Sequence, residues 1–331
     1  MSGLIRVGII NDTRNAHHMG CWLVMRNLFR LLGEHRMKVE WCWPTGREWR
    51  TSRTLNRRRR VDLVLVNAEG SIHDSQDHPL AERFASVAGH FKTKFDIPSV
   101  LINATVHNNQ PEINDLLSDY ALIFTRDTAS TQALGSAGID AETVSDLTLA
   151  YPLDHRNESS VSSRPMVTDS ASRGISRQLE GFARSQGYPY IPIQYARFPH
   201  PHRIATPRRY LGKARRWIFD KIRHRPGLDR YISRIRDSSV VITGRYHAVT
   251  MCLLTAAPFL AVESSIPKIS WLLQDAFGST DRVVREVREL ADIASAAPRA
   301  WSTHERARLD RYLESCQASN DRMMTRIRQV A

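Results

Sequence analysis

Short apolar runs alternate with amphipathic stretches along most of the chain. Residues 4–10 and 61–67 have the length and apolar character of buried strands, and each runs into a polar loop. Residues 20–32 carry apolar side chains at helical spacing. The same reading predicts further elements in chain order: strand 39–43, helix 79–93, strands 99–103 and 121–126, helix 130–137 and strand 143–146.

A second series of the same kind follows a polar, Ser-rich stretch at residues 154–164, which is typical of a linker. Its predicted elements are strand 166–170, helix 174–186, strand 190–194, a strand and turn at 239–247, helix 248–257 and strand 258–262. A charged helical pattern over residues 302–330 predicts one C-terminal helix. Alternation of strands with helices favours parallel sheets in doubly wound α/β domains.

Composition narrows the class of protein. The chain has 331 residues, of which 42% are hydrophobic and 24% charged, as expected of two globular domains. Its apolar runs are shorter than the roughly 18 residues of a membrane span. The N-terminal residues lack the pattern of a signal peptide. The four cysteines form no CxxC pair, which argues against a zinc site or a disulfide framework. We therefore expect a cytoplasmic protein.

The positive charge is concentrated in two patches. The net charge is +13 and the pI is near 10.0. Residues 197–236 hold 13 Lys and Arg against two Asp, and residues 47–60 hold seven Arg against one Glu. The rest of the chain is slightly acidic. Because zinc-finger spacing, RNP-like aromatics and basic heptads are all missing from the sequence, we expect no nucleic-acid partner. For Arg57–Arg60, an arginine-rich face that is solvated and only aids solubility is as good an interpretation as a site that binds an anion.

The larger patch contains an amphipathic basic segment, residues 208–225, in which Trp217 belongs to the apolar face. A helix of this type can lie on an anionic membrane surface, which predicts peripheral contact with the inner face of the inner membrane. The alternative is a surface helix that packs on its own domain. Prolines bracket the segment, which favours an insertion or flap.

The candidate chemistry lies at predicted strand ends. Gly244, Arg245 and His247 occupy the point where a buried strand gives way to a helix. Arginine presents a planar fork for phosphate or carboxylate, and histidine exchanges a proton near neutral pH. The alternative is an arginine salt-bridged to the first domain and a histidine that caps the helix.

Other polar residues follow the remaining strands, where ligands of doubly wound sheets bind. They are Asn11, Asp12, His17, His18, Glu69, His73, Asn103, His107, Arg126 and Asp146. For His17 and His18 a metal role is possible, but a substrate role is favoured because adjacent residues suit joint ligation poorly. Glu69 is either a catalytic carboxylate or the anchor of a turn. His73 and His107 either contact substrate or cap helices. For Asp127, which follows Arg126, a role as a helix cap is as good an interpretation as a role in the site.

The ordered set of motifs resembles the polysaccharide pyruvyl transferase family over about residues 4–280. The motifs are Asn11-Asp12-Thr13, His17-His18-Met19-Gly20-Cys21, Asn67-Ala68-Glu69-Gly70-Ser71-Ile72-His73, Thr125-Arg126-Asp127, Ser145-Asp146-Leu147 and Gly244-Arg245-Tyr246-His247, with Pro258-Phe259 and Lys268. One departure is Ala68, where relatives usually carry glycine. The segment 197–236 matches no part of the family pattern.

The resemblance implies a GT-B-like fold with two Rossmann-type domains that face a central cleft. We expect residues 1–155 on the acceptor side, residues 165–300 with the basic insertion 197–236, and a helix at 301–331 that packs across both. The implied reaction moves pyruvate from phosphoenolpyruvate onto two hydroxyls of a sugar. It uses no cofactor beyond this donor and requires no metal, since arginine can stabilise the departing phosphate.

The roles that follow from the resemblance are specific. Arg245 and Arg126, with Gly244, are expected to bind phosphoenolpyruvate. His247 is the expected acid, and Glu69 or His73 the base. The acceptor side is expected to comprise Asn11, Asp12, His17, His18, Asn103 and His107. The excess of arginine suits an acidic sugar such as 3-deoxy-octulosonic acid (Kdo), free, nucleotide-activated or lipid-linked, in surface polysaccharide or lipopolysaccharide synthesis.

Two other functions compete with this one. A GT-B glycosyltransferase that uses a nucleotide sugar would share the fold and an arginine-rich donor site. A non-enzymatic basic protein would bind a membrane or nucleic acid through residues 197–236.

Overall fold

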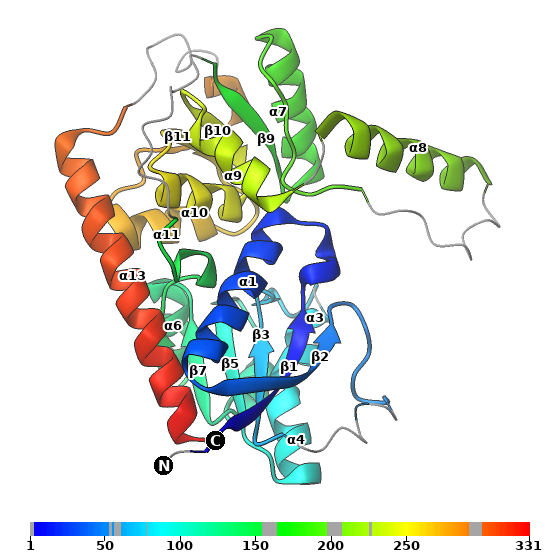
Figure 1. Ribbon diagram of the computed structural model, residues 1–331, viewed down its shortest axis with the longest axis vertical. Helices are drawn as coiled ribbons and strands as arrows, with labels where there is room; N and C mark the ends of the chain where they lie inside the picture. The colour runs from blue at the N-terminus through cyan, green and yellow to red at the C-terminus, as the bar shows by residue number, and fades with distance from the viewer. Residues whose placement is uncertain are drawn as a thin grey trace. The chain divides into compact units, whose positions relative to one another are not determined.

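The computed structural model describes residues 3–52, 55, 61–77, 79–153, 164–196, 207–224, 227–290 and 300–331. The linker expected at 154–164 therefore lies almost entirely outside the described residues, as do Arg57–Arg60. The chain divides into two compact units. Unit 1 comprises Met1–Asn15, Val24–Pro152 and Arg311–Ala331, and unit 2 comprises Ala16–Leu23 and Leu153–Asp310. Figure 1 shows the elements of both.

Unit 1 is built on a parallel sheet of six strands in the order β2-β1-β3-β5-β7-β8. The strands are β1 (Ile5–Asp12), β2 (Met37–Pro44), β3 (Leu63–Asn67), β5 (Ser99–Ala104), β7 (Leu122–Thr125) and β8 (Glu142–Thr143). Every residue of β3 and β5 is buried, as expected for parallel strands covered on both faces. A separate pair, β4 (Ile72–His73) and β6 (Val106–His107), is also parallel.

Helices cover the sheet of unit 1. They are α1 (Met19–Glu34), α3 (Leu80–Ala85), α4 (Val87–Phe95), α5 (Pro111–Leu117), α6 (Thr128–Ser136) and the end of α13 (Thr303–Gln329), with the 3₁₀ turns Arg14–Ala16 and Leu147–Leu149. The single helix predicted at 79–93 is instead two helices, because the chain turns at Ser86 between them. The predicted C-terminal helix is confirmed. Its residues Met323, Met324 and Ile327 belong to a core of unit 1.

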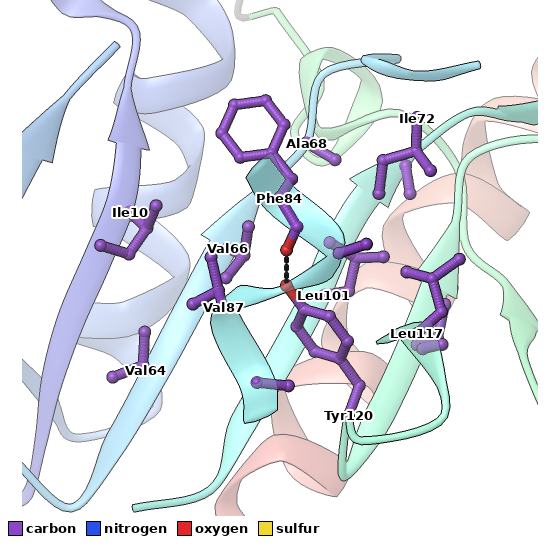
Figure 2. Packing of buried hydrophobic residues seen from close by; sticks show 14 of the residues in the cluster. Ile10, Val64, Val66, Ala68, Ile72, Phe84, Val87, Leu101, Leu117 and Tyr120 are labelled. Carbon is purple, nitrogen blue, oxygen red and sulfur yellow. Dashed lines mark hydrogen bonds between the residues drawn. The ribbon is translucent and has the colours of Figure 1, made fainter. Parts of the chain in front are cut away.

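The other core of unit 1 packs α3, α4 and α5 against the sheet (Figure 2). Val66 and Leu101 from the strands meet Phe84 and Val87 from the helices. Tyr120 extends into the same cluster, and its hydroxyl donates to the Phe84 carbonyl at 2.5 Å. The buried hydroxyl is thereby satisfied, and burial raises the tyrosine pKa well above its ordinary value.

Unit 2 contains a parallel sheet of four strands in the order β12-β11-β10-β9. The strands are β9 (Met166–Ser170), β10 (Val241–Gly244), β11 (Phe259–Val262) and β12 (Val283–Val284). The predicted strand at 190–194 is reduced to isolated bridges, one of which pairs Tyr190 with Val167 of β9. The helices are α7 (Arg173–Ser185), α8 (Pro207–His224), α9 (Leu228–Arg236), α10 (Tyr246–Thr255) and α11 (Lys268–Phe277), with the 3₁₀ turn Val287–Glu289.

The two described helices of the basic segment differ in their packing. Tyr231, Ile232 and Ile235 of α9 are buried, and the Tyr231 hydroxyl donates to Thr168 at 3.1 Å. This part of the predicted insertion therefore belongs to the core of unit 2. By contrast, α8 carries Leu211 and Ile222 with 66% and 71% of their surface exposed. Within the described ranges, every helix is too short or too polar to cross a membrane.

Candidate active site

The strand order of unit 1 reverses between β1 and β3. From β1 the chain adds β2 on one side, and β3 and the later strands lie on the opposite side of β1. Ligands of doubly wound sheets bind beyond the carboxyl ends of strands at such a switch point. Three asparagines occupy the carboxyl ends of adjacent strands here: Asn11 of β1, Asn67 of β3 and Asn103 of β5. Asn11 and Asn103 have φ angles of 67° and 57°, in the left-handed region that asparagine tolerates better than most residues.

The three side chains are buried, with exposed fractions of 4%, 0% and 4% in chain order. Asn11 Nδ2 donates to the Asn67 carbonyl at 2.6 Å, and Asn103 Oδ1 accepts from the Leu147 amide at 3.2 Å. The Oδ1 atoms of Asn11 and Asn67 and the Nδ2 atom of Asn103 find no hydrogen-bond partner among the described residues. Leaving such atoms unpaired costs about 1–3 kcal/mol each, so this edge is prepared for a polar ligand.

Glu69 follows β3 in the same region. Its φ of 41° places it in a tight turn, and its Oε1 accepts from Asn67 Nδ2 at 2.8 Å and from the Thr13 hydroxyl. The carboxylate is therefore held in one orientation. Asp12 is differently engaged, because Arg14 binds both of its oxygens, with Nη2 at 2.6 Å from Oδ2. This ion pair occupies the carboxylate that the sequence assigns to the acceptor.

His73 and His107 are brought side by side. They are register partners in the pair β4–β6, although 34 positions separate them in sequence. His73 Nδ1 lies 3.2 Å from Asp74 Oδ2. Asn108 donates to the other oxygen of Asp74 at 2.8 Å, and this hydrogen bond is the main cause of the lowered pKa of Asp74. Both histidines lie in short strands.

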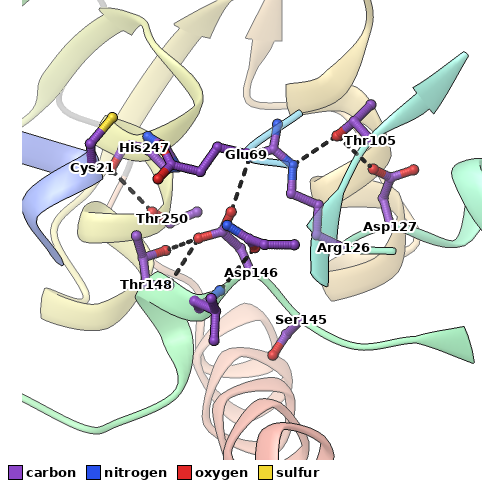
Figure 3. A network of polar contacts seen from close by, with 12 residues as sticks. Cys21, Glu69, Thr105, Arg126, Asp127, Ser145, Asp146, Thr148, His247 and Thr250 are labelled. Carbon is purple, nitrogen blue, oxygen red and sulfur yellow. Dashed lines mark hydrogen bonds and ion pairs between the residues drawn. The ribbon is translucent and has the colours of Figure 1, made fainter. Parts of the chain in front are cut away.

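Arg126 lies in a buried network at the end of β7 (Figure 3). Its Nη1 donates to Asp146 Oδ2 at 3.1 Å, and the two side chains are 3% and 0% exposed. Its Nε donates to Thr105 Oγ1 at 2.8 Å. The neighbouring Asp127 caps α6 by accepting from the Ser130 amide at 2.8 Å, which confirms the capping alternative for this aspartate. The guanidinium of Arg126 is thus already paired with a carboxylate.

In unit 2 the strand order reverses between β9 and β10. Tyr190, which follows β9 in sequence, bridges to one side of β9, and β10 pairs with the other side. Arg245 directly follows β10, and its Nε and Nη2 both donate to Asp169 Oδ2, at 2.8 and 2.5 Å. Gln194 Oε1 accepts from the same Nη2 at 3.0 Å. The other Asp169 oxygen accepts from the Ile193 amide at 2.8 Å. The fork of Arg245 is consequently fixed in direction.

Gly244 has a packing role at this point. A Cβ built on it would lie 2.5 Å from Cβ of Ser170, its partner in the β9–β10 register. Only glycine allows the two strand ends to approach this closely.

His247 occupies the first turn of α10 and is buried. Its ring meets that of His18 edge to face, with centroids 5.5 Å apart. Burial, followed by the charges of His247 and Arg245, holds the pKa of His18 well below its ordinary value. Cys21 lies beside His247 (Figure 3). Residues 16–23 therefore contribute to unit 2, although the sequence places them in the first domain.

A comparison with known families tests the resemblance that the motifs carry. A family model described as polysaccharide pyruvyl transferase matches residues 21–265. The chain belongs to the polysaccharide pyruvyl transferase family. The matched range includes Glu69, Arg126, Arg245 and His247, while His18 and the residues before it precede the match. A search of the curated proteins found no match to the chain.

Solved structures of low sequence identity share the fold of this chain. The UDP-GlcNAc 2-epimerase of Methanocaldococcus jannaschii, in complex with UDP-GlcNAc and UDP, has a TM-score of 0.56 at 11% identity, over 99% of this chain and 100% of that chain. The S. aureus MnaA–UDP structure has a TM-score of 0.52 at 12% identity, over 96% of this chain and 92% of that chain. A functionally uncharacterised protein of Klebsiella pneumoniae has a TM-score of 0.51 at 10% identity, over 86% of this chain and 93% of that chain. The predicted GT-B-like α/β class is confirmed. A cleft between the domains stays a prediction.

Three residues that matter in these networks are not among the candidates drawn from the sequence of this transferase. Asp169 fixes Arg245, Asn67 bears one of the unsatisfied amide oxygens, and Cys21 lies against two histidines. Asn67 and Cys21 stand inside the motifs, so their position gave a signal. Asp169 ends a predicted strand in the same way as the other candidates. Only the contact with Arg245 distinguishes it.

Proposed function

We propose that the protein transfers the pyruvyl unit of phosphoenolpyruvate onto two hydroxyls of a sugar, as a ketal, and releases phosphate. Family membership implies a transferase of the pyruvyl class in polysaccharide synthesis. The observation that carries the finer proposal is the orientation of Arg245 by Asp169, with His247 two residues further along. A fixed arginine fork suits the phosphate or carboxylate of phosphoenolpyruvate.

The proposed reaction begins with a proton transfer. His247 donates a proton to the methylene carbon of phosphoenolpyruvate, so that C2 becomes electrophilic. The first sugar hydroxyl adds to C2 and gives its proton to Glu69 or His73. The bond between C2 and the phosphate oxygen then breaks, and phosphate leaves with its charge stabilised by Arg245. The second hydroxyl adds to C2 and returns a proton to His247, while the base passes its proton to phosphate.

The asparagine edge of unit 1 supports a sugar acceptor. Asn11, Asn67 and Asn103 present amide oxygens and an amide nitrogen that have no partner among the described residues. A sugar hydroxyl both donates and accepts hydrogen bonds, so it would satisfy both kinds of atom. We assign acceptor binding to this edge, with Glu69 oriented beside it. An acidic sugar such as Kdo, free, nucleotide-activated or lipid-linked, is the proposed acceptor, in surface polysaccharide or lipopolysaccharide synthesis.

Arg126 is proposed to support the site from within unit 1. The resemblance assigns Arg126 to donor binding, and its guanidinium is also paired with buried Asp146 and hydrogen-bonded to Thr105. A Cβ on Gly70 would lie 2.4 Å from Arg126 Nη2, so the turn after Glu69 packs directly on the guanidinium. This contact links the arginine to the orientation of the carboxylate.

We further propose that α8 contacts an anionic membrane surface, where a lipid-linked acceptor would be found. Leu211, Ile218 and Ile222 recur at spacings of seven and four, so they form one stripe on the helix. They are 66%, 49% and 71% exposed. Lys213 and Arg215 on the same helix are also exposed. Exposed apolar side chains with basic neighbours are the pattern of a helix that lies in a membrane interface.

The test of the transferase is direct. The protein is incubated with phosphoenolpyruvate and candidate sugars, and phosphate release is followed together with the mass gain of a pyruvate ketal on the sugar. Turnover that is lost in Arg245→Ala and His247→Ala supports the proposal. Hydrolysis or transfer of a nucleotide sugar, with no consumption of phosphoenolpyruvate, would identify a glycosyltransferase instead. Membrane binding that persists in both variants, without turnover on any sugar, would identify a non-enzymatic protein.

A further inference from the structure

One group of side chains in unit 2 has the composition of a transition-metal site. One ring nitrogen of His18, the Sγ of Cys21 and one ring nitrogen of His247 all lie within 4.8 Å of one another. We call these residues the imidazole–thiol cluster. Both histidines are buried and Cys21 is partly buried. In the described part of the chain, this is the one group of at least three His, Cys, Asp or Glu side chains with this spacing.

The fold brings the cluster together from two helix starts. His18 immediately precedes α1, and its Nδ1 accepts from the amide of Cys21 in the first turn at 3.4 Å. His247 lies in the first turn of α10. The backbone of Gly20 lets the second imidazole approach, since a Cβ there would lie 2.3 Å from the ring. The long hydrogen bond to Nδ1 is weak, and a cation can displace it.

The surroundings of the cluster suit thiolate and imidazole ligands. The first turn of a helix stabilises a thiolate through the helix dipole. Both imidazoles are buried, and imidazole nitrogen is the commonest protein ligand of cations of this class. Arg245 is the nearby cation, and the carboxylate of Asp169 offsets its charge at 2.5 Å.

We propose that the imidazole–thiol cluster binds a divalent transition-metal cation of the Zn²⁺ class. Thiolate and imidazole ligands select Zn²⁺ and Co²⁺ over Mg²⁺ and Ca²⁺, which prefer oxygen. Tetrahedral Zn²⁺ holds neighbouring N and S ligand atoms about 3.3–3.7 Å apart, so small side-chain rotations close the present separation. Three protein ligands leave a fourth position for water or a substrate oxygen.

Occupation of the cluster has a consequence for activity. The cation would hold the imidazole of His247, which the proposed transfer requires as a proton donor. Zn²⁺ would therefore inhibit the enzyme, and a chelator would restore turnover. This consequence rests on the proposed function, whereas binding itself does not.

Cobalt provides the test, because a thiolate bound to Co²⁺ gives a near-ultraviolet charge-transfer band. We expect the full-length protein to develop this band up to one equivalent of Co²⁺ and to lose it when Zn²⁺ is added. Cys21→Ser should abolish the band, and His18→Gln should weaken Co²⁺ binding at least about tenfold. Cys42→Ser is the matched control, since burial raises the pKa of the Cys42 thiol to about 11 and no cluster surrounds it among the described residues.

A second measurement needs no variant. Zn²⁺ should slow the alkylation of Cys21, and not that of Cys42, when modified peptides are followed by mass spectrometry. A wild-type protein without the cobalt band, a band that survives Cys21→Ser, or alkylation of Cys21 unchanged by Zn²⁺ would overturn the site. Binding of Co²⁺ by a protein that transfers no pyruvyl group would overturn the proposed function and leave the site standing.

Discussion

Gly20 of α1 lies directly against the ring of His247: a Cβ added at Gly20 would be 2.3 Å from Cβ, Cγ and Nδ1 of the histidine. Contacts this short force one partner to move. A side chain at position 20 would therefore displace either the start of α1 or His247. The glycine therefore sets the position of the proposed acid.

Gly20→Ala should lower turnover by about 100-fold, the loss expected when a reacting group is displaced by about 1 Å. Overpacking should also lower the free energy of unfolding by about 1–3 kcal/mol. Steady-state kinetics and thermal unfolding measure the two effects. Gly33→Ala on the same helix is the control, because a Cβ there meets nothing within 4 Å. Equal activity of the two variants would show that Gly20 does not position the histidine.

Asp169→Asn should raise KM for phosphoenolpyruvate more than it lowers kcat. The asparagine removes the charge that fixes the Arg245 fork, and an increase of about tenfold corresponds to roughly 1.4 kcal/mol of binding. Asp237→Asn is the matched control, since Asp237 pairs with Arg236 at 3.1 Å on the more exposed face of the same unit. An unchanged KM in Asp169→Asn would show that this carboxylate does not orient Arg245 for donor binding.

Arg126→Met should lower the free energy of unfolding by about 3–5 kcal/mol, because it leaves the buried Asp146 carboxylate without its partner. The double variant Arg126→Met/Asp146→Asn should recover part of that loss in denaturant titrations. Arg6→Met breaks the surface pair with Asp62, whose side chains are 45% and 33% exposed, and should lower the free energy of unfolding far less than Arg126→Met does. Similar losses in both single variants would contradict a buried, structural pair.

The triple change of Leu211, Ile218 and Ile222 to Ser should weaken binding to phosphatidylglycerol vesicles by at least about tenfold. Burial of one such side chain contributes about 1.5 kcal/mol or more. Co-sedimentation gives the affinity, and vesicles of phosphatidylcholine should bind the wild type weakly. Leu4→Ser/Leu80→Ser is the control, because these exposed apolar residues lie outside α8. Equal binding to the two lipids would refute the proposed contact.

Acidification should destabilise unit 1 partly through His90, whose ring meets Trp49 edge to face at 4.9 Å. Burial, followed by the charge of Lys94, lowers the His90 pKa. The unfolded chain then takes up the proton first, so the stability present above about pH 6.5 is lost as the pH falls through the folded pKa. His90→Gln should flatten the dependence of Tm on pH between about 7 and 5. Parallel curves for variant and wild type would contradict this origin.

Most of the fold followed from local patterns. Residues 61–67 and 99–103 read as buried strands because parallel strands covered on both faces are apolar throughout, and β3 and β5 lie there. Boundaries were less predictable. The break at Ser86 has no glycine or proline to mark it, and the burial of α9 was invisible within a segment dominated by arginine.

By itself, the sequence determined the alternation of strands and helices and the polar residues at strand ends, because each of these depends on neighbours a few positions apart. The order of the motifs along the chain indicated the family. The tertiary structure alone decided which of those residues meet. Asp169 and Arg245 are 76 positions apart, and Arg126 and Asp146 are 20 apart. Partners over such separations are set by strand order and register. For that reason the sequence could identify the two arginines as candidates, whereas only the folded sheets show which carboxylate each arginine pairs with.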